Sequence, residues 1–128
     1  MVIDTSALLA ILLGEPERGA FLKLLSESET RLLSAANALE TAIVVETRRG
    51  VAAGGELDLF LQRTKIEIVA VDVEQVAIAR LAWRKFGKGR HPAGLNFGDC
   101  FAYALTKMSS EPLLATGTDF RQTDLRLL

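Results

Sequence analysis

Four acidic residues occupy positions from which their carboxylates could meet. Met1–Asp4 is a short apolar stretch that predicts a strand, and Asp4 stands at its end. Asp119 lies just past a second predicted strand, Pro112–Ala115, and Asp99 lies in the first turn of the helix that precedes that strand. Sites in open parallel α/β sheets form beyond the carboxyl ends of the strands. If the two strands are neighbours, these three acids come within reach of one point.

Glu40 is the fourth acid, and its position on a helix decides its interpretation. The pattern predicts a helix over Ala35–Arg49, which places apolar residues three and four positions after Glu40 on the same side. A carboxylate on an apolar stripe is costly unless something pairs with it. Glu40 is therefore expected to face inward and to need a cation. Glu46 points to another side of the helix and, with Arg49 three residues on, is a candidate for a surface ion pair.

Each acid also has an ordinary structural interpretation. Asp99 could close a capping box with Asn96, and Asp119 could do the same with Thr116. Asp4 could cap the helix that follows it, and the glutamate could meet a buried arginine. Like charges gathered in a partly desolvated crevice, however, repel and raise each other's pKa, which a divalent cation would relieve. Ligation by oxygen atoms alone suits Mg²⁺, with Mn²⁺ possible.

The elements that must position these acids alternate between short strands and longer helices, which predicts a three-layer αβα domain with a mostly parallel sheet and right-handed crossovers. The predicted strands are Met1–Asp4, Thr30–Ser34, Ile66–Val71, Pro112–Ala115 and a last one near Leu125–Leu128. The predicted helices run from Thr5 to near Gly14, onward from Glu15-Pro16, over Ala35–Arg49 and Gly55–Thr64, from a capping box at Asp72 to about Phe86, and over Phe97–Ser109. Gly87–Leu95, with three glycines and a proline, predicts a loop.

Length and composition narrow the classes of protein. At 128 residues the chain predicts a single domain over residues 1–128. The single cysteine, Cys100, excludes an intrachain disulfide and suits a reducing cytoplasm. The longest apolar run, Ala7–Leu13, is far shorter than the ~20 residues of a membrane helix, so a cytoplasmic protein without a membrane segment is expected. With a net charge of −1, any nucleic-acid contact must come from a local patch.

One such patch follows the fifth predicted helix. No acid occurs between Gln75 and Gly98. The basic residues in this stretch are Arg80, Arg84, Lys85, Lys88 and Arg90. We expect this stretch to contact RNA or a protein partner, or to be a solvated helix end whose cations complement the helix dipole. Trp83 and Phe86, interleaved with them, could be core, a stacking platform or a partner surface. Arg48 and Arg49 form a second, smaller patch.

The sequence blocks around the four acids resemble those of the PIN-domain ribonucleases, most closely the VapC toxins of type II toxin–antitoxin pairs. The matching blocks are Val2–Leu8, Ser34–Thr41, Leu95–Ala104 and Leu113–Phe120. They span the whole chain in the expected spacing. The Asn-Phe-Gly-Asp and Thr-Asp-Phe blocks are specific, whereas Val-Ile-Asp-Thr-Ser alone is a weak signal.

The resemblance implies a PIN-like domain that hydrolyses RNA with a water activated by Mg²⁺ or Mn²⁺. It also implies a homodimer and a small VapB-type antitoxin. The family's four acidic positions, catalytic and metal-binding, are matched by Asp4, Glu40, Asp99 and, at the most variable of them, Asp119. The small hydroxyl positions beside the first acid are matched by Thr5 and Ser6, and a polar position near the metal by Thr116.

Three other functions compete with this interpretation. A phosphatase or phosphotransferase that forms a phosphoaspartate needs an acid two residues after the first, where this chain has Ser6, and a lysine nearer the site than Lys107. A structure-specific DNA nuclease would use the same metal chemistry. A catalytically silent RNA- or protein-binding module would be expected to have lost at least one of the four acids, and all four are present.

Overall fold

A four-stranded parallel sheet forms the centre of the molecule. The structure is a computed structural model that describes residues 1–128. The strands are β1 (Val2–Ile3), β2 (Leu32–Ser34), β3 (Glu67–Val69) and β4 (Leu113–Leu114), in the order β3-β2-β1-β4. In the register, Val2 is opposite both Leu32 and Leu113. β1 and β4 are therefore neighbours, as the meeting of the acids requires.

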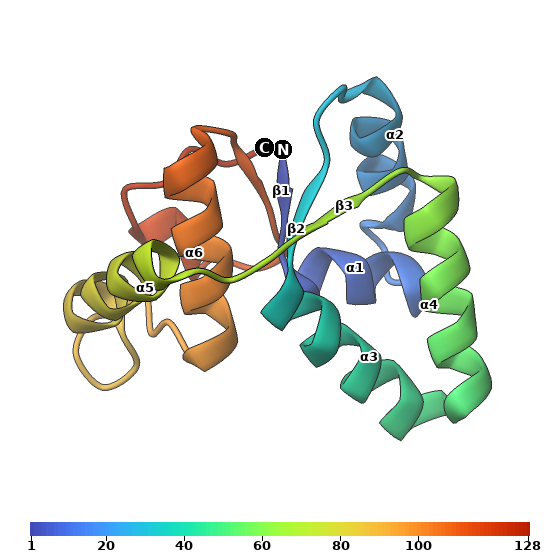
Figure 1. Ribbon diagram of the computed structural model, residues 1–128, viewed down its shortest axis with the longest axis horizontal. Coiled ribbons are helices and arrows are strands. Elements are labelled where there is room, and N and C mark those ends of the chain that lie inside the picture. Colours follow the sequence, from blue (N-terminus) through green and yellow to red (C-terminus); the bar gives the residue numbers. More distant parts are fainter.

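Helices cover both faces of the sheet, which confirms the predicted three-layer fold (Figure 1). The helices on one side are α1 (Thr5–Leu12), α2 (Arg18–Glu27), α3 (Ala35–Arg49) and α4 (Val51–Arg63). Those on the other side are α5 (Val73–Phe86) and α6 (Phe97–Ser109), and a short 3₁₀ turn spans Phe120–Gln122. Successive strand residues point to opposite faces. Val2 accordingly packs with α5 and α6, whereas Ile3 packs with α1 and α4.

Two predicted boundaries were wrong for reasons that packing explains. The last strand is reduced to one bridge, between Leu113 and Leu127, because Leu125 and Leu127 pack against the core without forming a ladder. The helix expected from Gly55 begins at Val51. Gly54 lies within this helix. A Cβ at position 54 would come within 2.8 Å of the Glu46 side chain, so the glycine lets α4 approach α3 closely.

The same packing removes the ion pair expected between Glu46 and Arg49. Glu46 lies against Gly54, and no salt bridge joins it to Arg49. The Arg49 guanidinium instead donates to the carbonyl oxygens of Leu12 and Leu13, each at 3.5 Å, at the end of α1. Other differences are small, since α1 ends at Leu12, α2 begins at Arg18 and β3 is shorter than expected. Every helix is too short or too polar to cross a bilayer.

Candidate active site

The carboxyl ends of β1 and β4 form the floor of the site. The backbone N–H of Asp4 donates to the carbonyl of Leu114 at 2.9 Å, which fixes the end of β1 beside the end of β4. Two residues further along each connection, the N–H of Thr116 donates to Ser6 Oγ at 3.0 Å. Ser6 therefore ties the turn after β4 to the first turn of α1, and Asp4 points out of the same corner.

Asp4 is a buried acid with one oxygen used and one left over. Its Oδ2 accepts from the N–H of Ser6 at 3.0 Å, the expected helix cap. Its Oδ1 is buried and has no hydrogen-bond partner. Burial raises the pKa of Asp4, the hydrogen bonds from Ser6 oppose that rise, and the charge of Glu40 adds to it. The helix cap thus accounts for Oδ2 of Asp4. Oδ1 is a buried acceptor without a partner in the chain, which is typical of an atom that binds a ligand.

Glu40 faces the same corner without a basic partner. Its Oε1 accepts from Thr5 Oγ1 in a short hydrogen bond and from Asn37 Nδ2 at 3.3 Å. It forms no salt bridge, so the buried arginine considered for it is absent. Glu40 is half-buried and points toward Thr5 and Asn37, but Ile43, three residues on, is 56% exposed, so the apolar stripe that predicted an inward orientation lies on the surface.

Asn37 and Gly98 complete this part of the site, although sequence reasoning gave neither a role. Buried Asn37 also donates from Nδ2 to the Gly98 carbonyl at 3.0 Å, which joins α3 to the start of α6. A Cβ at position 98 would overlap the Glu40 carboxylate, so only glycine allows this approach. Both residues lie in the family-like blocks beside Glu40 and Asp99, which was the available signal.

Asp99 forms the predicted capping box with Asn96 and also lies near the other three acids. Its Oδ2 accepts from the N–H of Asn96 at 3.0 Å, and Asn96 Oδ1 accepts from the N–H of Asp99 at 2.9 Å, a full capping box. The pKa of Asp99 is raised to about 6, mainly by desolvation; the hydrogen bond from Asn96 opposes this rise, and the charges of Asp4, Asp119 and Glu40 add to it. Asp99 therefore lies close enough to the other three acids for their charges to affect its ionisation.

Asp119 is the most exposed of the four. It precedes the Phe120–Gln122 turn, but its side chain makes no capping hydrogen bond, so the capping box expected with Thr116 does not form. Thr116 instead uses its backbone N–H on Ser6. Asp119 therefore places a carboxylate at the exposed side of the corner, and its side chain caps no helix.

This corner fits a hard divalent cation by its chemistry. All donors are oxygen atoms, no lysine or arginine pairs with them, and Asp4 Oδ1 is left without a partner in a buried position. The carboxylates do not form a ready-made cage: no group of three or more His, Cys, Asp or Glu side chains is assembled closely enough to hold an ion by itself. Mg²⁺ suits such a site because it retains several waters and shares coordination with substrate phosphates.

The basic residues of the predicted patch differ in their surroundings. Lys88 lines a cavity between α5 and α6, together with Arg80 and Trp83. The guanidinium of Arg90 lies 4.2 Å from the centroid of the Trp83 ring. Arg84, Lys85 and Arg48 are exposed, with Lys85 above the edge of the core at Phe86. Phe86 is therefore core and Trp83 is not, which separates two aromatic residues that the sequence left equivalent.

Comparisons with known proteins agree with the blocks around the acids. The family model described as "PIN domain" matches residues 1–125. A protein named Ribonuclease VapC from Mycolicibacterium smegmatis is 54% identical over 125 residues, which cover 98% of this chain and 97% of that protein. Ribonuclease VapC30 from Mycobacterium tuberculosis is 52% identical over 125 residues, covering 98% of this chain and 95% of that one.

Solved structures show the same fold at low sequence identity. The toxin VapC20 of Mycobacterium tuberculosis, described as cleaving the sarcin–ricin loop, superposes with a TM-score of 0.81 at 17% identity, over 99% of this chain and 97% of that one. A chain of VapBC2 from Rickettsia felis, bound to a DNA fragment from its promoter, gives a TM-score of 0.78 at 16% identity, over 99% and 96% of the two chains.

Proposed function

The chain belongs to the PIN-domain family, among its VapC ribonucleases, and on this basis we propose that it is the toxin of a VapBC-type pair, an endoribonuclease dependent on Mg²⁺ or Mn²⁺. The observation that carries the proposal is the set of unpaired carboxylates at the ends of β1 and β4, with Asp4 Oδ1 buried and without a partner. The names of the relatives support RNA as the substrate, and VapC20 is described as a toxin that cleaves the sarcin–ricin loop.

The four acids divide the work of holding a cation and a water. Asp4, Glu40, Asp99 and Asp119 would bind one or two ions, directly or through water. A bound ion lowers the pKa of its water toward neutrality and stabilises the charge that develops on the phosphate. Asp99 or Asp119 would orient the attacking water and take up its proton. Water as nucleophile leaves a 5′-phosphate and a 3′-hydroxyl.

The polar neighbours keep these carboxylates in place. Thr5 and Asn37 hold Oε1 of Glu40, so that Oε2 is left for the site. The N–H of Ser6 holds one oxygen of Asp4, and the N–H of Asn96 holds one oxygen of Asp99. Asp4, Glu40 and Asp99 are therefore each anchored by one oxygen and accept no hydrogen bond at the other, an arrangement that orients ligands without neutralising them, whereas Asp119 has no such anchor.

The partners follow from the same family membership. We propose a small VapB-type antitoxin and a homodimer of this chain, and the paired toxin and antitoxin in the Rickettsia felis structure support the first of these. A toxin of this kind is expected to be purified with its antitoxin bound, so activity must be measured on protein freed from it.

The test is cleavage of total cellular RNA by the purified, antitoxin-free chain. Mg²⁺ or Mn²⁺ is compared with EDTA, and wild type with Asp4→Asn. Asp124→Asn is the matched control, because Asp124 is an acid outside the site that is paired with a lysine. We expect discrete fragments from wild type and the control, only with metal, and none from Asp4→Asn. Cleavage that persists in Asp4→Asn, or none from wild type with either metal, would overturn the proposal.

A further inference from the structure

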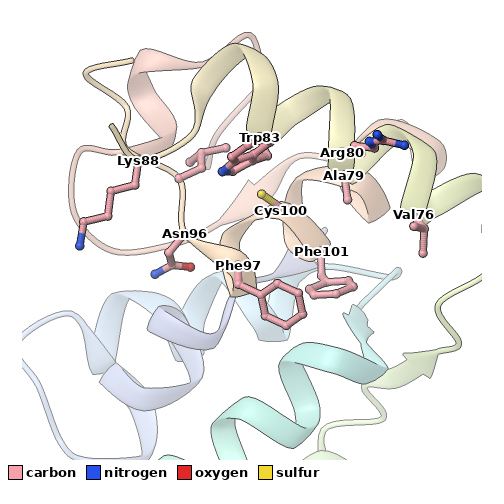
Figure 2. Close-up of a pocket in the computed structure, with 10 residues that line it drawn as sticks. Val76, Ala79, Arg80, Trp83, Lys88, Asn96, Phe97, Cys100 and Phe101 are labelled. Carbon is pink, nitrogen blue, oxygen red and sulfur yellow. The ribbon is translucent and has the colours of Figure 1, made fainter. Parts of the chain in front are cut away.

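A largely apolar cavity of about 700 Å³ opens between α5 and α6, beside the turn that carries Asp99. Figure 2 shows Trp83 of α5 across the cavity from Phe97 and Phe101 of α6, with the sulfur of Cys100 between them. A volume of this size lies within the ~300–1,000 Å³ range of pockets that hold small-molecule ligands. The cavity therefore has room for a nucleotide.

Trp83 is held in place as one wall of this cavity. A Cβ at Gly87 would come within 2.6 Å of Trp83 Cδ1, so the glycine allows the indole to pack against the backbone of the following loop. The Arg90 guanidinium lies against the ring at 4.2 Å from its centroid. The side chain is nevertheless 42% exposed, whereas Phe86, three residues on, is 5% exposed. Trp83 is thus a fixed aromatic surface that the core does not use.

The two charged residues that line the cavity are both basic. Arg80 and Lys88 are its only charged lining residues, and they lie on different sides of it in Figure 2. The stretch from Gln75 to Gly98 contains no acid, so no carboxylate of this stretch opposes them. An aromatic wall with flanking cations is the arrangement that binds single-stranded nucleic acid, because the base stacks while the cations meet the phosphates.

The cavity adjoins the acidic corner along the first turn of α6. Asn96, Phe97 and Cys100 line it and surround Asp99 on the first turn of α6. Phe97 and Phe101 also line a second cavity of about 370 Å³, which reaches Glu40. A strand of RNA whose phosphate lies at the acids can therefore place a neighbouring base against Trp83.

We propose that the cavity between α5 and α6 binds an unpaired nucleobase of the RNA substrate next to the scissile phosphate, with Trp83 as the stacking surface and Arg80 and Lys88 on adjacent phosphates. The inference rests on the proposed function, because it takes RNA as the substrate. Charge favours this occupant over an apolar protein segment, since such a segment would leave two cations at the rim without partners.

The first test uses Trp83 as its own reporter, because it is the only tryptophan in the chain. Full-length Asp4→Asn protein, with Mg²⁺, is titrated with a single-stranded RNA of about eight nucleotides. We expect saturable quenching of the tryptophan fluorescence. An abasic ribose-phosphate chain of the same length carries the same charge without bases, and should bind more weakly and leave the fluorescence unchanged. Equal quenching by both chains would overturn the stacking role.

The second test measures cleavage by variants in the otherwise wild-type chain. Trp83→Ala is expected to raise KM by about 5- to 100-fold with little change in kcat, and Trp83→Phe to restore most of the loss. Leu81→Ala is the matched control, because Leu81 is a 60% exposed apolar residue of the same helix that does not line the cavity. It should cleave like wild type.

The outcomes separate this inference from the proposed function. Metal-dependent cleavage that needs Asp4 but is unchanged in Trp83→Ala would overturn the inference and leave the ribonuclease in place. RNA that quenches Trp83 but is never cut would overturn the ribonuclease and retain the binding site. If only antitoxin, and no RNA, quenches Trp83, the cavity is a protein-docking surface and the inference is wrong.

Discussion

The two ends of helix α6 differ in whether the acidic side chain beside them is paired with a base. Toward its C-terminus, Asp124 accepts hydrogen bonds from Tyr103 Oη and Lys107 Nζ, both at 2.7 Å. Desolvation alone would raise the pKa of Asp124, but the hydrogen bonds from Lys107 and Tyr103 outweigh it and lower the pKa. This acid is paired within the chain and needs nothing from outside.

At the N-terminus of the same helix, Asp99 faces three other acids and no base. Its pKa rises to about 6, first because of desolvation and then because of the neighbouring negative charges. Since the chain pairs the acid at Asp124 with a lysine, the unpaired acids at the other end of α6 support the proposed cation site. The contrast distinguishes a structural carboxylate from one reserved for a ligand.

The largest expected effect comes from Asp99→Asn. The asparagine oxygen can still accept from the N–H of Asn96, so the capping box is kept and only the charge is lost. We expect RNA cleavage to fall by at least ~100-fold, because the loss of a ligand charge removes stabilisation of the transition state. Rates are compared at saturating metal with those of Asp124→Asn, which should remain near wild type. Equal losses in the two variants would remove the distinction between the ends of α6.

Metal binding should stabilise the wild-type chain progressively, with the logarithm of the metal concentration once that concentration exceeds Kd. At a hundred times its Kd, a ligand that binds only the folded state contributes about 2.7 kcal/mol, which shifts the melting temperature by several degrees in a domain of this size. Thermal denaturation with increasing Mn²⁺ measures this shift. Asp4→Asn should lose it and Asp124→Asn should retain it. A wild-type melting temperature that does not respond to metal would contradict the idea that the acids await a cation.

The metal-free chain should lose stability as the pH rises through the range in which Asp99 ionises. Because its pKa is about 6 when folded and near 3.8 when unfolded, the folded state binds more protons between those values, and the free energy of unfolding falls as pH increases. After allowance for solvent screening, the loss is about 1–2 kcal/mol. Asp4, whose pKa is also raised, acts in the same direction. Urea midpoints in EDTA at pH 4.5 and 7.5 measure the change, which Asp99→Asn should reduce.

Much of the site could be predicted from the sequence because Asp4 and Asp99 each lie at the end of an element. Periodicity locates the ends of β1 and β4 and the first turn of α6, and a parallel sheet brings such ends together. Asp4 and Asp99 were therefore found with their capping roles and their shared corner.

The parts that escaped prediction depend on how helices pack. Gly98 and Asn37 matter because α3 and α6 meet at one distance and angle, which no single-chain pattern encodes. Glu46 lost its expected partner because α4 packs against it at Gly54. Trp83 and Phe86 are three residues apart on one helix, and only the rotation of α5 against α6 decides which of them is buried.

The smallest effect should follow from breaking the structural pair. Lys107→Ala removes a 2.7 Å ion pair between side chains that are 39% and 42% exposed, so we expect a loss of less than about 1 kcal/mol at neutral pH and no change in cleavage. Because the pKa of Asp124 is lowered in the folded state, the stability from this pair is present above the unfolded value of 3.8 and is lost as the pH falls through the folded pKa. Urea midpoints of wild type and Lys107→Ala should therefore converge in acid, where Asp124 is protonated. Those of wild type and Asp99→Asn also meet there because Asp99 is protonated, but at neutral pH the two stability differences have opposite signs. A Lys107→Ala variant that loses RNA cleavage would show that the two ends of α6 are coupled, and that the paired acid is not purely structural.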